Sequence, residues 1–123
     1  MKILIVEDEE ALAQVLKEKF EKEDFEVKIV VDGETALPLV KSFMPDMVLL
    51  DLILPKKSGV EVLKEMKLEE DIKDIPVIIL SNLSEDEDIK EGLALGAKDY
   101  FVKTQHPINE VIEKAKNYLI QPK

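Results

Sequence analysis

Apolar residues along this chain follow two alternating patterns: short continuous runs, and stretches in which they recur three or four positions apart. The continuous runs over residues 2–6, 47–51 and 76–81 are typical of strands that a parallel sheet buries on both faces. The segments 27–31 and 98–102 are predicted as the other two strands. The spaced stretches are typical of amphipathic helices, and they predict helices over residues 11–20, 35–43, 60–69, 85–95 and 107–119. Five such alternations predict an α/β fold, with a doubly wound parallel sheet, right-handed crossovers and helices on both faces.

The fourth predicted helix carries the clearest local signals for its ends. Ser84-Glu85-Asp86-Glu87 has the form of a capping box, which predicts Ser84 as the N-cap residue. Gly96 predicts the C-terminal end of the helix. Gly92 lies inside the helix, where a glycine costs about 1 kcal/mol relative to alanine, and nothing else in the sequence explains it.

The composition limits the classes of function. With 46% hydrophobic and 36% charged residues, the chain has the make-up of a globular protein, and its 123 residues predict a single domain over residues 1–123 with no output domain. The net charge of −10 argues against direct binding to nucleic acid. All 17 basic residues are lysines, which excludes an arginine clamp on phosphate. No apolar run reaches the roughly 20 residues of a membrane span. There is also no signal-peptide pattern and no cysteine, so we expect no membrane contact and a cytoplasmic location.

Polar residues follow four of the five predicted strands, where each apolar run stops. They are Glu7 and Asp8, Asp51, Ser81 and Lys103. Because the carboxyl ends of the strands in an open α/β sheet share one edge, these side chains can converge there. Converging carboxylates repel one another and require a cation, and oxygen ligands favour a hard ion such as Mg²⁺ or Ca²⁺ over zinc. A carboxylate beside such an ion, a lysine and a hydroxyl has the equipment for phosphoryl transfer to the carboxylate.

Each of these residues also has an ordinary structural interpretation. Glu7 and Asp8 are the kind of acid that many helices carry in their first turn. Asp51 can cap the turn that follows its strand, Ser81 can be a strand-end hydroxyl, and Lys103 can be a solvated lysine. Only the joint occurrence of these residues in order favours a functional site.

Four segments in chain order carry a resemblance to a known family. They are Val6-Glu7-Asp8, residues 45–55 with Ser58-Gly59, residues 76–81 and residues 96–103. With these segments, the chain from residue 2 to residue 119 resembles the bacterial response-regulator receiver domains of two-component signalling, of the chemotaxis-regulator type. The resemblance implies a flavodoxin-like (βα)5 fold whose five strands have the order 2-1-3-4-5.

The resemblance also implies roles for individual residues. Asp51 would accept a phosphoryl group from the phosphohistidine of a sensor histidine kinase or phosphotransfer protein, and Lys103 would pair with a phosphoryl oxygen. Ser81 would bond to the attached group, and Tyr100 would turn inward to read out that movement on the face of the fourth helix, fifth strand and fifth helix. The implied protein is a switch rather than an enzyme, with self-phosphorylation and slow self-dephosphorylation only. Its implied partners include a downstream output protein and, in the phosphorylated state, a second copy of the chain.

The implied cofactor is Mg²⁺, with Mn²⁺ as an alternative. Asp8, Asp51 and the backbone carbonyl of Ile53 would ligate the ion, and Glu7 would assist through a water molecule. In the resembled family, the residues two positions beyond the acceptor and two beyond the hydroxyl residue flank the path of the hydrolytic water. Here these are Ile53 and Leu83, whose bulky apolar side chains predict a long-lived phosphorylated state.

The sequence departs from the family pattern at Thr104, where the family usually has a proline after a cis peptide bond. A cis bond before a residue other than proline costs roughly 2.5–4 kcal/mol. The need to aim Lys103 at the phosphoryl group works against that cost, and we expect the Lys103–Thr104 peptide to be cis. The nearby His106 is expected to be neither a ligand nor a base.

Two other classes of function are compatible with parts of this pattern. A haloacid-dehalogenase-like phosphatase also uses a strand-end aspartate and magnesium, but it needs a second acid two residues later, where this chain has Ile53. A pseudo-receiver would have the same fold and bind partners without phosphorylation. The presence of every acceptor-site residue argues against it.

Overall fold

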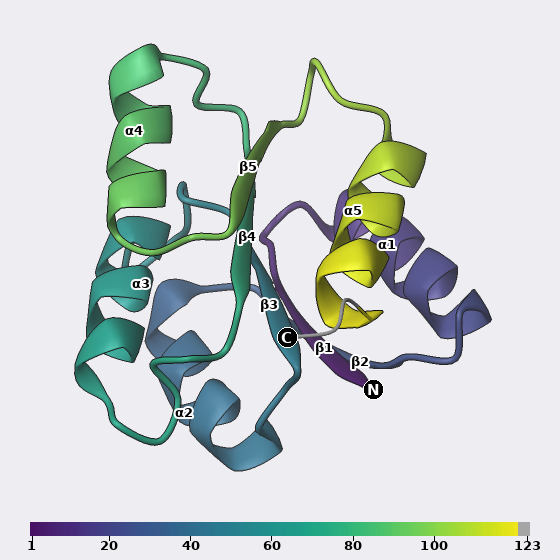
Figure 1. The fold of residues 1–123 in the computed structure, drawn as a ribbon, viewed down its shortest axis with the longest axis horizontal. Helices are drawn as coiled ribbons and strands as arrows, with labels where there is room; N and C mark the ends of the chain where they lie inside the picture. Colours follow the sequence, from purple (N-terminus) through teal and green to yellow (C-terminus); the bar gives the residue numbers. More distant parts are fainter. Residues whose placement is uncertain (121–123) are drawn as a thin grey trace.

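The structure is a computed structural model that describes residues 1–120. Five parallel strands form one sheet in the order β2-β1-β3-β4-β5, which confirms the predicted flavodoxin-like arrangement (Figure 1). The strands are β1 (Lys2–Val6), β2 (Glu26–Val30), β3 (Met47–Leu50), β4 (Val77–Ser81) and β5 (Asp99–Val102). The helices are α1 (Glu10–Lys22), α2 (Gly33–Phe43), α3 (Gly59–Leu68), α4 (Asp86–Ala94) and α5 (Ile108–Ile120).

The sheet is covered on both faces, so the protein has two hydrophobic cores. Helices α1 and α5 lie on one face, and α2, α3 and α4 lie on the other (Figure 1). Strand β3 supplies both cores, because Met47 and Leu49 point into the first while Val48 and Leu50 point into the second. A strand buried on both faces has no polar side, which explains the continuous apolar run of β3.

The topology brings distant parts of the sequence to one edge of the sheet. Strand β1 pairs with β2 on one side and β3 on the other, so Val6 lies opposite Leu50 in the ladder. Strand β4 pairs with β5, and Ser81 lies opposite Val102. Glu7, Asp51 and Lys103 each come directly after a strand, and they therefore emerge at the same edge as Ser81.

The start of α4 differs from the prediction. The N-cap residue is Glu85 rather than Ser84, and no side chain caps the helix, so the predicted capping box is wrong. Leu83 packs against the core and its carbonyl oxygen accepts a hydrogen bond from the Tyr100 hydroxyl. These contacts act on the segment before the helix, which begins only at Asp86. The acidic residues of the first helical turn, including Asp86, lie where the helix dipole favours negative charge.

Not every apolar residue of α1 faces the core. Ala13, Leu16 and Phe20 are buried, whereas Val15 is largely exposed. The helix itself is confirmed. Within residues 1–120 no helix is both long enough and apolar enough to span a membrane.

Candidate functional site

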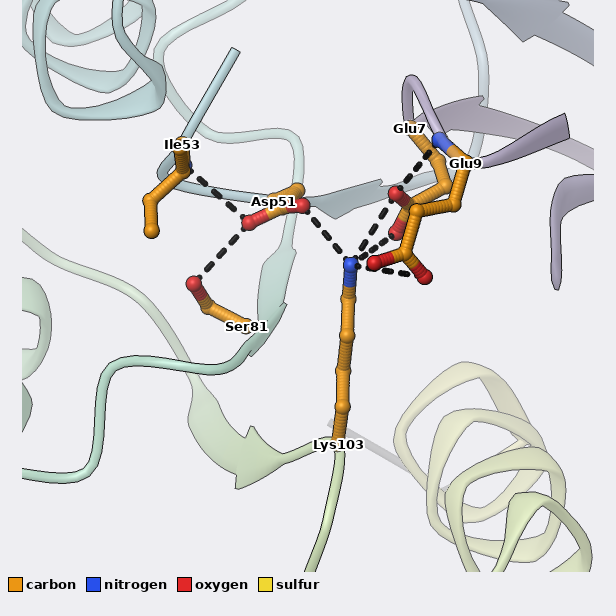
Figure 2. A network of polar contacts seen from close by, with 6 residues as sticks. All are labelled: Glu7, Glu9, Asp51, Ile53, Ser81 and Lys103. Carbon is orange, nitrogen blue, oxygen red and sulfur yellow. Dashed lines mark hydrogen bonds and ion pairs between the residues drawn. The ribbon is translucent and has the colours of Figure 1, made fainter.

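The predicted site residues meet at the carboxyl-terminal edge of the sheet. Figure 2 shows Glu7, Asp51, Ser81 and Lys103 pointing toward one another from the ends of four strands. Three of these side chains belong to buried residues, with Glu7 2%, Asp51 4% and Ser81 0% exposed. Buried polar groups require partners, and each of the three has one in the contacts described below.

Lys103 is the centre of the charged contacts. Its Nζ atom lies 2.8 Å from Asp51 Oδ2 and 2.8 Å from Glu7 Oε1, and 3.6 Å from Glu9 Oε2. The side chain is only 9% exposed, so these ion pairs are poorly screened by water. Lys103 therefore bridges two buried carboxylates and offsets the repulsion between them.

The second oxygen of Asp51 is held by neutral donors. The Ser81 hydroxyl donates to Asp51 Oδ1 at 2.9 Å, and the Ile53 N–H donates to the same oxygen at 3.1 Å. With Lys103 on Oδ2, the carboxylate is fixed at both oxygens. Fixed donors around a reacting oxygen stabilise charge without having to reorganise.

The burial of the charged groups alters their proton affinities. Burial raises the pKa of Glu7 to about 7, against the opposing effect of hydrogen bonds from Lys103 and the Glu9 N–H. Burial alone would lower the pKa of Lys103, but its hydrogen bonds to Asp51 and Glu7 outweigh burial, so its pKa is raised. The amine of Lys103 is therefore an ammonium ion at neutral pH.

Carboxylates at this edge are arranged so that they could hold a divalent cation. Glu7, Asp8 and Asp51 each offer an oxygen, and these oxygens lie within 4.8 Å of one another. Carboxylate oxygens are the ligands that a hard divalent cation such as Mg²⁺ prefers. A cavity of about 140 Å³ opens beside them, lined by Asp8, Glu9, Asp51, Ile53, Asn82 and Lys103. The donor set fits a hard cation because all of its ligands are oxygens.

Tyr100 lies inward, with 8% of its surface exposed. Its hydroxyl donates to the carbonyl oxygen of Leu83 at 2.8 Å, which ties β5 to the segment between β4 and α4. That segment begins directly after Ser81. The residue that bonds to Asp51 and the aromatic residue are therefore connected through a few residues of backbone.

The two residues predicted to slow dephosphorylation lie in different surroundings. Ile53 is 55% exposed and lines the cavity beside Asp51. Leu83 is partly buried and packs against the core. Of these two residues, Ile53 therefore lines the cavity together with Asp51, and Leu83 does not.

The turn after Lys103 differs from the prediction. Among the described residues every peptide bond is trans, so the predicted cis Lys103–Thr104 bond is wrong. The trans form avoids the cost of a cis bond before a residue other than proline, and the ion pairs of Lys103 form without it.

Three residues near the site were not singled out as functional from the sequence. Glu9 reaches Lys103, Asn82 lines the cavity, and His106 contacts the backbone of β5. Glu9 belongs to an acidic run, and Asn82 directly follows Ser81. Their positions in the sequence are the signals that point to Glu9 and Asn82. The contact of His106 with the backbone of β5 has no sequence signature.

A comparison with family models identifies the domain. The model of the response regulator receiver domain matches residues 3–116. The chain belongs to this family. The receiver domain is 38% identical over 102 residues to the phosphate regulon transcriptional regulatory protein PhoB of Rhizobium meliloti. That match covers 83% of this chain but 45% of PhoB, so the chain spans less than half of that relative's length.

Solved structures of other receivers have the same architecture. The Mn²⁺-bound form of response regulator Rcp1 superposes with a TM-score of 0.86 at 29% identity, covering 99% of this chain and 96% of that one. The phosphorylated cyanobacterial phytochrome response regulator RcpA gives a TM-score of 0.85 at 30% identity, covering 98% and 94%. Receiver domains of response regulators are phosphoacceptor switches, and the family assignment decides against the phosphatase alternative.

Proposed function

We propose that Asp51 of this receiver domain accepts a phosphoryl group from the phosphohistidine of a sensor histidine kinase or phosphotransfer protein. The observation that carries this proposal is the geometry of the Asp51 carboxylate, with Lys103 at 2.8 Å on one oxygen and Ser81 at 2.9 Å on the other. The carboxylate also borders the 140 Å³ cavity through which a donor can approach.

The transfer step requires only positioning and charge neutralisation from the protein. An oxygen of Asp51 forms a bond to phosphorus while the phosphorus–nitrogen bond of the donor breaks, and the released imidazole takes a proton from solvent. Lys103 lies close enough to neutralise a phosphoryl oxygen on that side. The Ser81 hydroxyl is placed to donate to another oxygen of the attached group.

The acidic residues at the site are proposed to bind Mg²⁺, with Mn²⁺ as an alternative. Asp8, Asp51 and the carbonyl oxygen of Ile53 would hold the ion. Glu7, whose carboxylate forms an ion pair with Lys103, would act through a water molecule. When bound, the ion neutralises charge that builds up on the transferred phosphoryl group. The observation that supports this role is the all-oxygen donor set described above. The Mn²⁺-bound receiver Rcp1 is a supporting parallel.

The phosphorylated state is proposed to change the face formed by α4, β5 and α5. Ser81 is drawn to the phosphoryl group, and the segment behind it carries the Leu83 carbonyl to which Tyr100 is bonded. A change at Asp51 therefore reaches β5 through one hydroxyl and a short stretch of backbone. The proposed partners of this domain are a histidine kinase, which donates the phosphoryl group, and a downstream output protein, which binds the changed face.

The proposed function is tested by intact mass after incubation with acetyl phosphate and Mg²⁺. The wild type is expected to gain one phosphoryl group, and Asp51→Asn none. A matched control is Asp71→Asn, an exposed aspartate in the loop before β4, which should label like the wild type. Chelation of the divalent ion should abolish labelling. If Asp51→Asn labels as well as the wild type, the acceptor assignment is wrong, and an unlabelled wild type favours the pseudo-receiver.

A further inference from the structure

The turn from β5 to α5 winds around a single backbone carbonyl. Gln105 N–H and His106 N–H both donate to the carbonyl oxygen of Val102, at 2.9 and 3.1 Å. Lys103 is the first residue of this turn, directly after Val102. The conformation of the turn therefore sets the position of the Lys103 backbone, from which the side chain extends to Asp51.

The ring of His106 adds a third contact to the same residue. Its Nδ1 atom lies 3.1 Å from the Val102 nitrogen and 3.2 Å from the Val102 oxygen. A carbonyl oxygen has two lone pairs, and those of Val102 are taken by the two backbone N–H groups of the turn. Nδ1 therefore accepts a hydrogen bond from the Val102 N–H, which places the ring proton on Nε2.

The Val102 N–H is available because β5 is an edge strand. Lys103 N–H donates to the carbonyl oxygen of Ser81 in the neighbouring strand at 2.9 Å. Successive N–H groups along a strand point in opposite directions, so the Val102 N–H points away from the sheet. The His106 ring, which packs edge-on against Phe101 with 5.1 Å between centroids, supplies the partner that a further strand would have supplied.

We infer that His106 is a positioning residue that fixes the β5–α5 turn on Val102 and thereby holds Lys103 against Asp51. The inference rests on the proposed function, in which Lys103 neutralises the phosphoryl group. Thr104 occupies the position after Lys103 and leaves that part of the backbone without the rigid φ of a proline. The turn depends instead on the three hydrogen bonds that converge on Val102.

The effect on chemistry follows from the short contacts of Lys103. Its ammonium group is useful only while it stays close to the reacting oxygens, and small displacements of a positioned group reduce rates strongly. Loss of the ring acceptor leaves the Val102 N–H without its partner and loosens the turn. Lys103 then spends less time at 2.8 Å from Asp51.

The first test compares the initial rate of labelling by acetyl phosphate and Mg²⁺ for three variants. His106→Ala is expected to label about three- to tenfold more slowly, the size of one neutral hydrogen bond. His106→Asn, whose side-chain oxygen can take the place of Nδ1, is expected to recover most of the rate. Gln105→Ala, which removes an exposed side chain of the same turn but keeps its backbone N–H, is expected to label like the wild type.

A double-mutant cycle separates positioning from general loosening. If His106 acts through Lys103, His106→Ala should slow the residual labelling of a Lys103→Ala variant by much less than it slows the wild type. An equal effect in both backgrounds overturns the inference, as does an Asn variant that is as slow as the Ala variant.

The second test does not depend on phosphorylation and therefore separates failure of the inference from failure of the proposed function. The rate of amine acylation at Lys103 is measured by peptide mass spectrometry, with the exposed Lys98 as an internal reference. His106→Ala should raise the Lys103 rate severalfold and speed exchange of the Val102 amide hydrogen, and His106→Asn should restore both. Unchanged rates in His106→Ala overturn the inference even if Asp51 is phosphorylated. If the wild type takes up no phosphoryl group, the proposed function fails, and these rates alone decide whether His106 positions Lys103.

Discussion

At the scale of single residues, the side chains that line the cavity are expected to determine how a water molecule can approach Asp51 once it is phosphorylated. Ile53 borders the cavity and exposes 55% of its surface, so its side chain lies in solvent beside Asp51. An apolar side chain there offers no hydrogen bond to a water molecule in line with the phosphorus–oxygen bond of phosphorylated Asp51. Leu83 packs against the core, and its backbone carbonyl oxygen accepts a hydrogen bond from the Tyr100 hydroxyl.

The phosphorylated protein is therefore expected to decay slowly. Polar residues at these two positions can orient the hydrolytic water, and such help is worth a factor of roughly a hundred or more. The decay of isolated phosphorylated protein is measured for the wild type and for an Ile53→Asn, Leu83→Glu double variant, which should decay faster. Because only Ile53 lines the cavity, Ile53→Asn alone should account for most of the difference, and Ile53→Val should decay like the wild type. Equal decay of wild type and double variant would contradict the prediction.

Gly92 is a second residue whose role depends on short distances to its neighbours in the core. It is buried inside α4, and a Cβ atom added there would lie 2.6 Å from Ile79 Cδ1 and 3.3 Å from the Tyr100 ring. A Cβ atom at this position would require the tip of the fully buried Ile79 side chain to shift. This explains a glycine that the sequence alone leaves unexplained.

Gly92→Ala is expected to destabilise the protein although alanine favours helix. Overpacking typically costs about 1–3 kcal/mol, and the gain of about 1 kcal/mol in helix propensity offsets part of it. Urea unfolding measures the change in the free energy of unfolding. Glu91→Ala, at the exposed neighbouring position, should change it by less than about 0.5 kcal/mol. A Gly92→Ala protein more stable than the wild type would show that α4 does not pack as described.

At the scale of elements, hydrophobic patterning predicts the inner strands well because β3 and β4 are buried along their whole length and cannot tolerate polar side chains within the sheet. The edge strand β2 instead alternates exposed and buried residues. The helix ends are predicted less well because they depend on contacts outside the helix. The Ser84 motif fits a capping box in isolation, but Leu83 is held by the core and by Tyr100, and the helix begins later. The same limit applies to His106, whose contact with Val102 exists only after the turn has formed.

The start of α2 has a side-chain cap that depends on ionisation. Asp32 is its N-cap, and its Oδ1 accepts hydrogen bonds from the Thr35 N–H at 2.9 Å and the Thr35 hydroxyl at 3.0 Å. The bond from the Thr35 N–H is the main cause that lowers the pKa of Asp32 below its ordinary value. A lowered pKa in the folded state contributes stability above the ordinary pKa, and this contribution is lost as the pH falls through the folded value.

Asp32→Ala should therefore be less stable than the wild type at pH 7, and the difference in Tm should narrow when the pH falls below about 3.9, the ordinary value for aspartate. Thermal unfolding at a series of pH values measures this. Asp32→Asn keeps an uncharged oxygen at the cap, so its difference from Asp32→Ala should change little with pH. A wild-type advantage over Asp32→Ala that stays constant from pH 7 to pH 3 would show that ionisation of Asp32 does not strengthen the cap.

At the scale of the whole molecule, the site depends on strand order, which periodicity does not determine. The apolar runs predict where each strand ends, but the meeting of Glu7, Asp51 and Lys103 requires that β1, β3, β4 and β5 be neighbours. The resemblance to receiver domains implies that strand order, and the structure has it. The resemblance did not supply the direct contacts of Lys103 with Glu7 and Glu9, because those contacts follow from how far each side chain reaches across the edge.

The same edge of the sheet brings several carboxylates close together in the folded protein, and they repel one another. Lys103 compensates Glu7 and Asp51, while Asp8 is exposed at the rim of the cavity and contributes further repulsion. A divalent cation that binds this cluster binds the folded state only, because the unfolded chain scatters Glu7, Asp8 and Asp51. Ligand binding confined to the folded state stabilises it by mass action.

Mg²⁺ is therefore expected to raise the melting temperature of the unphosphorylated protein. At a hundredfold excess over Kd the gain is about 2.7 kcal/mol, which for a domain of this size corresponds to a rise of roughly 10 °C in Tm. Calorimetry with Mg²⁺ and after chelation measures the shift, and it should saturate with Mg²⁺ concentration. Asp8→Ala removes one proposed ligand at an exposed position, so it should fold normally and lose most of the gain, whereas Asp71→Ala, an exposed acid in the loop before β4, should keep it. Because a general effect of ionic strength would stabilise all three proteins alike, an equal gain in Asp8→Ala would rule out binding at this cluster.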